Sequence, residues 1–170
     1  DLLAELIPAA RAAGLKVYIR VLEGLNRGAR SSLTGWETLV ERDLDGALTG
    51  YTSHADSDYR ELWVRAIGDV CARYELDGVQ FGAERSGPLP RLLYRGDLPF
   101  GFSDQTKAAA SESGIDPERA IEGFRALASV VREGKRLGGE GALISVMRTL
   151  FRYPEIAAWD RLMYQQREGL

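Results

Sequence analysis

The chain has 170 residues, of which 45% are hydrophobic and 28% charged, and its formal net charge is −3. This length fits one domain with a sizeable core, and the slight negative charge provides no basic surface for nucleic acid or for an anionic membrane. The single cysteine excludes an internal disulfide and a multi-cysteine zinc site, and no apolar run is long enough to span a membrane.

The first elements predict alternating helices and strands. Apolar side chains recur at helical spacing over residues 2–13, and Gly14 is positioned to end that helix. Residues 16–22 are rich in Val, Ile and Tyr, which is typical of a strand. Residues 24–53 are punctuated by glycine and predict a loop with a short helix over 36–44.

A second amphipathic helix follows this loop. Asp58 and Glu61 have the spacing of a capping box, with Asp in place of Ser or Thr. Apolar side chains then repeat along one stripe over residues 62–74, so Cys71 is predicted to lie in the core.

The strand predicted next, over residues 78–84, ends on Glu84. The order helix, strand, loop, helix, strand favours parallel pairing. A carboxylate at the C-terminal end of a parallel strand is typical of catalytic acids in (β/α) barrels. Residues 1–98 are therefore predicted to be the α/β part of a (β/α)₈ TIM barrel.

The alternation of side chains along the two strands predicts which of them share a face. One set is apolar and should face covering helices: Val17, Ile19, Val21, Val79, Phe81 and Ala83. The other set should face the barrel interior: Tyr18, Arg20, Leu22, Gln80, Gly82 and Glu84. This assignment brings Arg20 near Glu84.

Residues 99–170 predict helices alone, over about 116–137, 142–152 and 155–167. Asp116 precedes a proline at the first helical position, and Pro154 ends a later helix. We expect this helical region to pack on or over the barrel, as a lid, a cleft wall, a subunit contact that allows oligomers, or a plain outer layer. A full barrel needs about 250 residues, so the chain is expected to be a segment of a longer protein.

These residues resemble a family of glycoside hydrolases with a TIM-barrel domain. The likeness is carried by residues 14–18, 57–60, 76–89, 114–120 and 152–156. Relatives of this kind carry a Cys-Phe-Cys-x-x-Cys cluster where this chain has Gly101-Phe102-Ser103-Asp104-Gln105-Thr106. Because every Cys of that cluster is replaced, no metal or redox role is carried over to this chain.

The resemblance implies hydrolysis of a glycosidic bond between two carboxylates. Glu84 would be the acid/base, and its partner would lie on a later strand outside this segment. The side chains expected to contact the sugar, through its hydroxyls or by stacking, are Arg85, Arg20, Tyr18, Glu23, His54, Trp36 and Tyr51. No metal or cofactor is expected. The structural alternative for Glu84 is a salt bridge with Arg20 or Arg85 at the strand end.

Two other functions are compatible with the same pattern. One is a non-catalytic carbohydrate-binding or scaffold protein, which needs an aromatic groove but no second carboxylate. The other is a different barrel enzyme, such as a sugar-phosphate isomerase or an aldolase, which needs metal ligands or a Schiff-base lysine. The three lysines are Lys16, Lys107 and Lys135, and none follows a predicted strand. The last function is therefore the least favoured.

Overall fold

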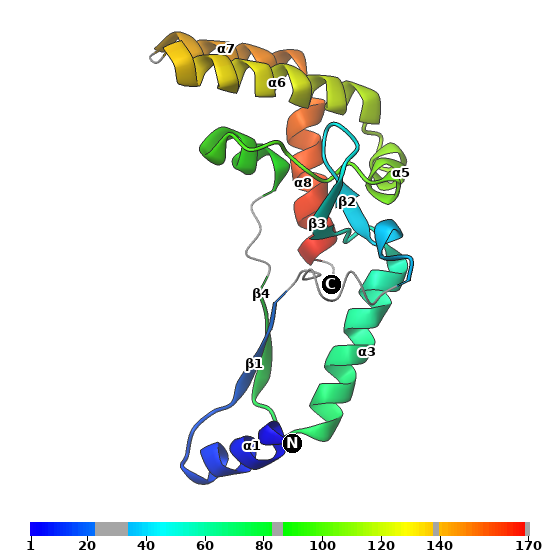
Figure 1. Cartoon of the computed structure of the whole chain (residues 1–170), viewed down its shortest axis with the longest axis vertical. Coiled ribbons are helices and arrows are strands. Elements are labelled where there is room, and N and C mark those ends of the chain that lie inside the picture. Colours follow the sequence, from blue (N-terminus) through cyan, green and yellow to red (C-terminus); the bar gives the residue numbers. More distant parts are fainter. Residues whose placement is uncertain (23–33, 83–86, 138–139, 169–170) are drawn as a thin grey trace.

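A computed structural model describes residues 1–22, 34–82, 87–137 and 140–168. The molecule is elongated, with helix α1 and a two-stranded ribbon at one end and the paired helices α6 and α7 at the other (Figure 1). In this view α3 extends from the hairpin region toward the end that carries α1, apart from the ribbon, and α8 and the β-hairpin are both in the upper half (Figure 1). Helices make up about 64% of the described residues.

The ribbon consists of β1 (Tyr18–Leu22) and β4 (Gly78–Gly82), which pair in parallel from Tyr18 opposite Gly78 to Leu22 opposite Gly82. Helix α1 (Leu2–Ala12) precedes β1, begins at its N-cap Asp1 and is followed by Gly14 at φ 74°. The predicted helix, strand and parallel pairing are thus confirmed. The chain beyond each strand leaves from the same edge of the ribbon.

The predicted TIM-barrel segment is wrong for the described part of the chain. Its four short strands form two separate two-stranded sheets, and no barrel is present. Parallel barrel strands require strand neighbours on both sides and helices outside, whereas among the described strands β1 and β4 pair only with each other. The alternation of side chains predicted the two strands and their pairing, but it carries no information about further strand neighbours.

The second sheet is a hairpin that the sequence pattern did not reveal. Strands β2 (Val40–Arg42) and β3 (Leu48–Thr52) pair antiparallel. The turn between them is held by the Asp43 carboxylate, which accepts hydrogen bonds from the Asp45 and Ala47 amides at 2.9 Å. The helix predicted over residues 36–44 is reduced to a 3-10 turn, η1 (Trp36–Thr38).

The N-cap of helix α3 (Ser57–Arg73) lies two residues before the predicted cap, Asp58. Its N-cap is Asp56, whose side chain accepts from the Tyr59 amide at 2.9 Å, so the Asp58 capping box is wrong. Tyr59 is the buried residue of this helix, while Leu62 is 53% exposed. Cys71 is exposed, which corrects its predicted place in the core. The side of α3 that carries the apolar stripe of residues 62–74 is not covered along its whole length by any described element.

The region after the ribbon is helical. It contains α4 (Pro88–Pro90), the π-turn η2 (Arg91–Arg95), α5 (Asp104–Glu112), α6 (Pro117–Leu137), α7 (Glu140–Arg152) and α8 (Glu155–Glu168). Asp116 caps α6 by accepting from the Glu118 and Arg119 amides at 3.0 and 3.1 Å, as predicted. Helix α7 ends before Pro154, again as predicted. Helix α5 was not predicted.

The hydrophobic core lies among α5, α6, α8 and the hairpin. The Phe102 ring stacks against Trp159 and meets Phe124 edge-on, with 5.4 Å between centroids in both pairs. Helices α6 and α8 approach closely at Gly123, where a Cβ would lie 2.9 Å from Cγ1 of Ile156. Leu44 from the hairpin and Leu92 from η2 are part of this core, so the helical region and the chain before residue 99 share one interior.

Asp77 connects the start of the ribbon to α1. Its Oδ2 accepts from the Val17 amide at 2.8 Å and from Arg11 Nη1 at 3.0 Å, while its own amide donates to the Val17 carbonyl at 2.9 Å. The Val17 amide and then the Arg11 guanidinium hold the pKa of Asp77 below its usual value.

This geometry predicts an acid-sensitive contribution to stability. A carboxyl group with a lowered folded-state pKa stabilises the fold above its unfolded pKa of about 3.9, and this contribution is lost as pH falls through the folded value. Asp77→Asn should lower Tm at pH 7, and the difference from wild type should shrink below about pH 4. Thermal unfolding followed by circular dichroism from pH 7 to pH 2.5 measures this. A Tm difference that stays constant over the whole range would contradict it.

Candidate functional site

The polar face of the ribbon carries two of the predicted sugar contacts. Tyr18 and Arg20 lie on this face of β1, and Gln80 lies opposite Arg20 on β4. The Tyr18 ring lies against Gly78, where a Cβ would come within 2.9 Å of two ring carbons. Tyr18 is 59% exposed, and Arg20 and Gln80 are also exposed. An aromatic ring, a guanidinium and a carboxamide therefore share one open surface.

The opposite face of the ribbon is apolar. Val17, Ile19, Val21 and Val79 are half-buried, in contrast to the exposed side chains across the ribbon. The period-two assignment of faces is confirmed for these described residues. The barrel interior that the prediction attached to the polar face is absent from the described structure.

Three predicted site residues, Glu84, Arg85 and Glu23, lie outside the described residues. Leu22 and Gly82 are the last paired residues of the two strands. In the sequence, Glu23 directly follows Leu22, and Glu84 comes two residues after Gly82. Because the strands are parallel, their last residues, Leu22 and Gly82, lie at the same end of the ribbon.

The other predicted contacts belong to the hairpin region and not to the ribbon face. Trp36 is half-buried at the start of η1. His54 is only 5% exposed, and its ring stacks with Tyr59 at a centroid distance of 6.1 Å. Tyr51 stacks on Phe100 at 4.1 Å and accepts a hydrogen bond from Arg91 at 3.2 Å. These side chains are engaged in packing around the hairpin.

A buried polar cluster joins the hairpin to α5, and the sequence analysis did not single it out. Glu41 is 1% exposed, and its carboxylate accepts from the Ser103 amide at 3.0 Å and from the Thr106 hydroxyl at 2.8 Å. The Ser53 hydroxyl lies 3.2 Å from that of Ser103, which in turn donates to Thr106 at 3.0 Å. Ser103 also caps α5. The only local signal was this Ser-x-x-Thr spacing at a helix start.

The last two cysteines of the relatives' Cys-Phe-Cys-x-x-Cys pattern correspond to Ser103 and Thr106 of this chain. These two hydroxyl side chains lie together in the buried polar cluster. Each hydroxyl has a partner within the cluster, and the chain of hydrogen bonds ends on the Glu41 carboxylate. Ser53, Ser103 and Thr106 are at most 2% exposed, so solvent and substrate do not reach them. The cluster is therefore structural.

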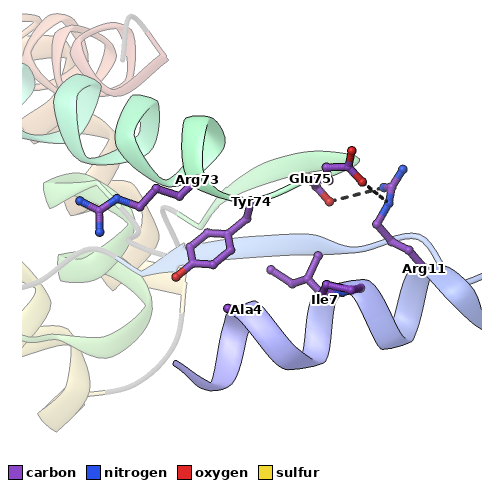
Figure 2. A pocket seen from close by; sticks show the side chains of 7 residues that line it. Ala4, Ile7, Arg11, Arg73, Tyr74 and Glu75 are labelled. Atoms are coloured by element: carbon purple, nitrogen blue, oxygen red, sulfur yellow. Dashed lines mark hydrogen bonds and ion pairs between the residues drawn. The ribbon is translucent and has the colours of Figure 1, made fainter.

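A groove of about 240 Å³ lies between α1 and the end of α3. Figure 2 shows Ile7 and Tyr74 facing one another across it, with Arg11 beside Glu75 at one end. Arg11 pairs with Glu75 at 3.4 Å and with Asp77 at 3.0 Å, while Arg73 pairs with Asp69 at 3.1 Å. Both arginines thus pair with carboxylates of this chain. We take the ribbon face as the stronger candidate site because an aromatic ring and polar side chains are exposed together on it.

Comparison with known proteins does not assign the chain to a family. No protein-family model, curated protein or solved structure matches the chain. Among the described residues, no group of three or more His, Cys, Asp or Glu side chains is arranged to hold a metal ion. Within the same part of the chain, no helix is both long and apolar enough to cross a membrane.

The buried cluster makes a prediction about stability. Glu41→Leu should lower the free energy of unfolding by about 1–3 kcal/mol, because the Ser103 amide and the Thr106 hydroxyl lose their acceptor in a dry interior. Glu41→Gln should cost less than about 1 kcal/mol, because the amide oxygen accepts from Ser103 while its NH₂ donates to the Thr106 hydroxyl.

Urea unfolding at pH 7 measures both changes. Glu37→Leu, on the exposed turn η1, is the matched control and should change stability by less than about 0.5 kcal/mol. If Glu41→Leu proved as mild as Glu37→Leu, the cluster would not be what holds the hairpin to α5.

Proposed function

We propose that this chain is a carbohydrate-active, glycoside-hydrolase-like catalytic segment in which Glu84 is the acid/base. The observation that carries the proposal is the parallel pairing of β1 and β4, from whose common edge the chain continues to Glu84, Arg85 and Glu23. The resemblance of residues 76–89 to glycoside hydrolases supports the same reaction. The parallel pair of strands is sufficient for this placement of Glu84, and a barrel is not required.

The ribbon face supports the choice of a sugar as substrate. A sugar ring has apolar C–H faces that stack on aromatic rings, and hydroxyls that need donors and acceptors around the rim. Tyr18 offers an exposed ring, and Arg20 and Gln80 offer polar groups on the same surface. A ligand stacked on Tyr18 would lie on the surface that leads toward the edge where Glu84 follows β4.

The proposed chemistry needs a carboxyl group at Glu84 that gives a proton to the glycosidic oxygen, and a second carboxylate that activates water or forms a covalent intermediate. Arg85, Arg20 and Glu23 are assigned to sugar hydroxyls. A guanidinium donates several hydrogen bonds in one plane, and a carboxylate accepts them, so the two types together suit the mixed donor and acceptor character of a hydroxyl group.

Replacement of the proposed acid/base tests the activity. Glu84→Gln keeps the shape of the side chain and removes its ionisable group, so turnover of aryl glycosides or oligosaccharides should fall by about 100-fold or more. Initial rates of the full-length protein on a panel of these substrates measure the effect. Glu112→Gln, at an exposed position on α5, is the control and should keep wild-type rates. Equal activity of Glu84→Gln and wild type would overturn the assignment of Glu84.

Carbohydrate binding without catalysis is the second candidate, favoured by the open Tyr18 ring over Gly78. Tyr18→Ala should weaken sugar binding by about 10-fold or more, whereas Tyr18→Phe, which keeps the ring, should bind nearly as well as wild type. Isothermal titration with oligosaccharides measures both. Tyr94→Ala removes another tyrosine that is 87% exposed and should leave binding unchanged.

The two candidates separate in these measurements. Sugar binding that depends on Tyr18, together with no turnover by wild type, supports the binding protein. Turnover that depends on Glu84 supports the hydrolase. If Tyr18→Ala binds as well as wild type, the ribbon face is not the sugar site.

A further inference from the structure

A second groove, of about 210 Å³, lies where the hairpin turn meets α5 and α6. Its floor is apolar, because Leu44, Phe102 and Ile121 line it and all three are buried. Charged side chains line the rest of the groove, and they come from the hairpin turn, from α5 and from α6. These three elements belong to the upper half of the molecule, away from the ribbon (Figure 1).

Two arginines of this groove donate hydrogen bonds to carbonyl groups of the hairpin turn. Arg42 Nη1 donates to the Gly46 carbonyl at 2.9 Å, and Arg125 Nη2 donates to the Leu44 carbonyl at 2.9 Å. Among the ion pairs of the described residues, none involves either guanidinium. A guanidinium has five N–H donors, so each of these two carries donors beyond the one that is bonded to the turn. The turn therefore holds two cationic donor groups at the groove.

The other charged side chains of the groove are one lysine and three carboxylates. Lys107 on α5 pairs with Asp104 at the long distance of 3.8 Å. The carboxylates that line the groove are Asp43, Asp45 and Glu118. Asp43 serves the turn, because its Oδ1 accepts from two backbone amides there. Asp45 and Glu118 are exposed and take part in no ion pair within the described part of the chain. Donors and acceptors thus share one small space above an apolar floor.

We propose that this groove binds a small carboxylic acid that also carries hydroxyl groups, such as an acidic sugar. The ligand's carboxylate accepts from Arg42 and Arg125, whose planar donor groups match the geometry of a carboxylate. Its hydroxyls donate to Asp45 and Glu118, and its C–H surface lies on the apolar floor. This inference does not depend on the proposed function.

The balance of charge and the size of the groove favour this class of ligand. Three carboxylates on the lining repel a phosphate or a polyanion, whereas two guanidiniums that make no ion pair among the described residues favour a single carboxylate. A neutral sugar leaves these guanidiniums without an anion. A groove of about 210 Å³ is smaller than the roughly 300–1,000 Å³ that holds a drug-sized molecule, so it suits a ligand of about one sugar ring.

The first experiment compares three probes by isothermal titration into the wild-type chain. Glucuronate should bind with a Kd of about 1 mM or tighter. Glucose lacks the carboxylate and cyclohexanecarboxylate lacks the hydroxyls, so each should bind at least about 10-fold more weakly. No binding of glucuronate at about 10 mM, equal binding of glucose, or tighter binding of inorganic phosphate would overturn the proposal.

Substitutions test the position of the ligand. Arg125→Ala should weaken glucuronate binding by about 10-fold or more. Arg132→Ala is the matched control, because Arg132 is exposed on the same helix and is not part of the groove lining. Lys107→Gln leaves both arginine bonds to the turn in place and removes one positive charge beside the groove, so it should weaken binding by about 3-fold or more.

The second substitution guards against a purely structural effect of the first. If Arg125→Ala lowers both Tm and affinity while Lys107→Gln binds like wild type, Arg125 only supports the turn and the proposal fails. Unchanged affinity in both variants would also overturn it.

A ribbon variant separates this groove from the proposed sugar site. Tyr18→Ala should bind glucuronate like wild type, because Tyr18 belongs to the ribbon and not to the groove. If Tyr18→Ala loses glucuronate while Arg125→Ala keeps it, the acid binds the ribbon, and the groove proposal fails while the ribbon site stands. Loss of glucuronate in Arg125→Ala, with unchanged binding of neutral oligosaccharides, supports the groove as a separate site.

Discussion

The buried carboxylate of Glu41 connects the hairpin to the helical region, and the arrangement of the upper half of the molecule depends on it. Removing a charge from water is costly unless donors surround it. Helix α5 supplies two donors, the Ser103 amide and the Thr106 hydroxyl, at its N-terminal end, where the helix dipole also favours negative charge. With β2 held there, Leu44 enters the core and the chain at residues 101–102 hydrogen-bonds to Arg42.

The ribbon obeys a different constraint, because two strands alone cover little surface and a two-stranded sheet is marginal by itself. Asp77 links both of its strands to α1, and only one face is apolar and half-buried. Polar side chains therefore have two roles in this molecule. Those around the hairpin are buried and hold elements together, whereas Tyr18, Arg20 and Gln80 are exposed on one face of the ribbon. This difference in exposure is the reason for placing recognition on the ribbon.

Much of the fold could be predicted where the signal was local. Asp116 before a proline started α6, and the break at Pro154 ended α7, because caps and proline act on neighbouring backbone groups. The hairpin was missed because β2 has only three residues and turns the charged Glu41 inward, against the usual pattern of burial. The buried hydroxyl cluster was missed because its members, residues 41, 53, 103 and 106, come from separate segments, so no single segment carries a recognisable pattern.

The sequence by itself determined the ribbon strands with their faces and helices α1, α3, α6, α7 and α8, since helix caps and apolar periodicity depend on residues a few positions apart. It also placed Tyr18 and Arg20 on one polar face, a prediction that the register confirms. Tertiary structure alone decided that the strands in the described part of the chain form two small sheets and no barrel, that Cys71 is exposed, and that His54 is buried. Each of these outcomes depends on which distant segment packs against a given face, and local patterns do not encode that choice.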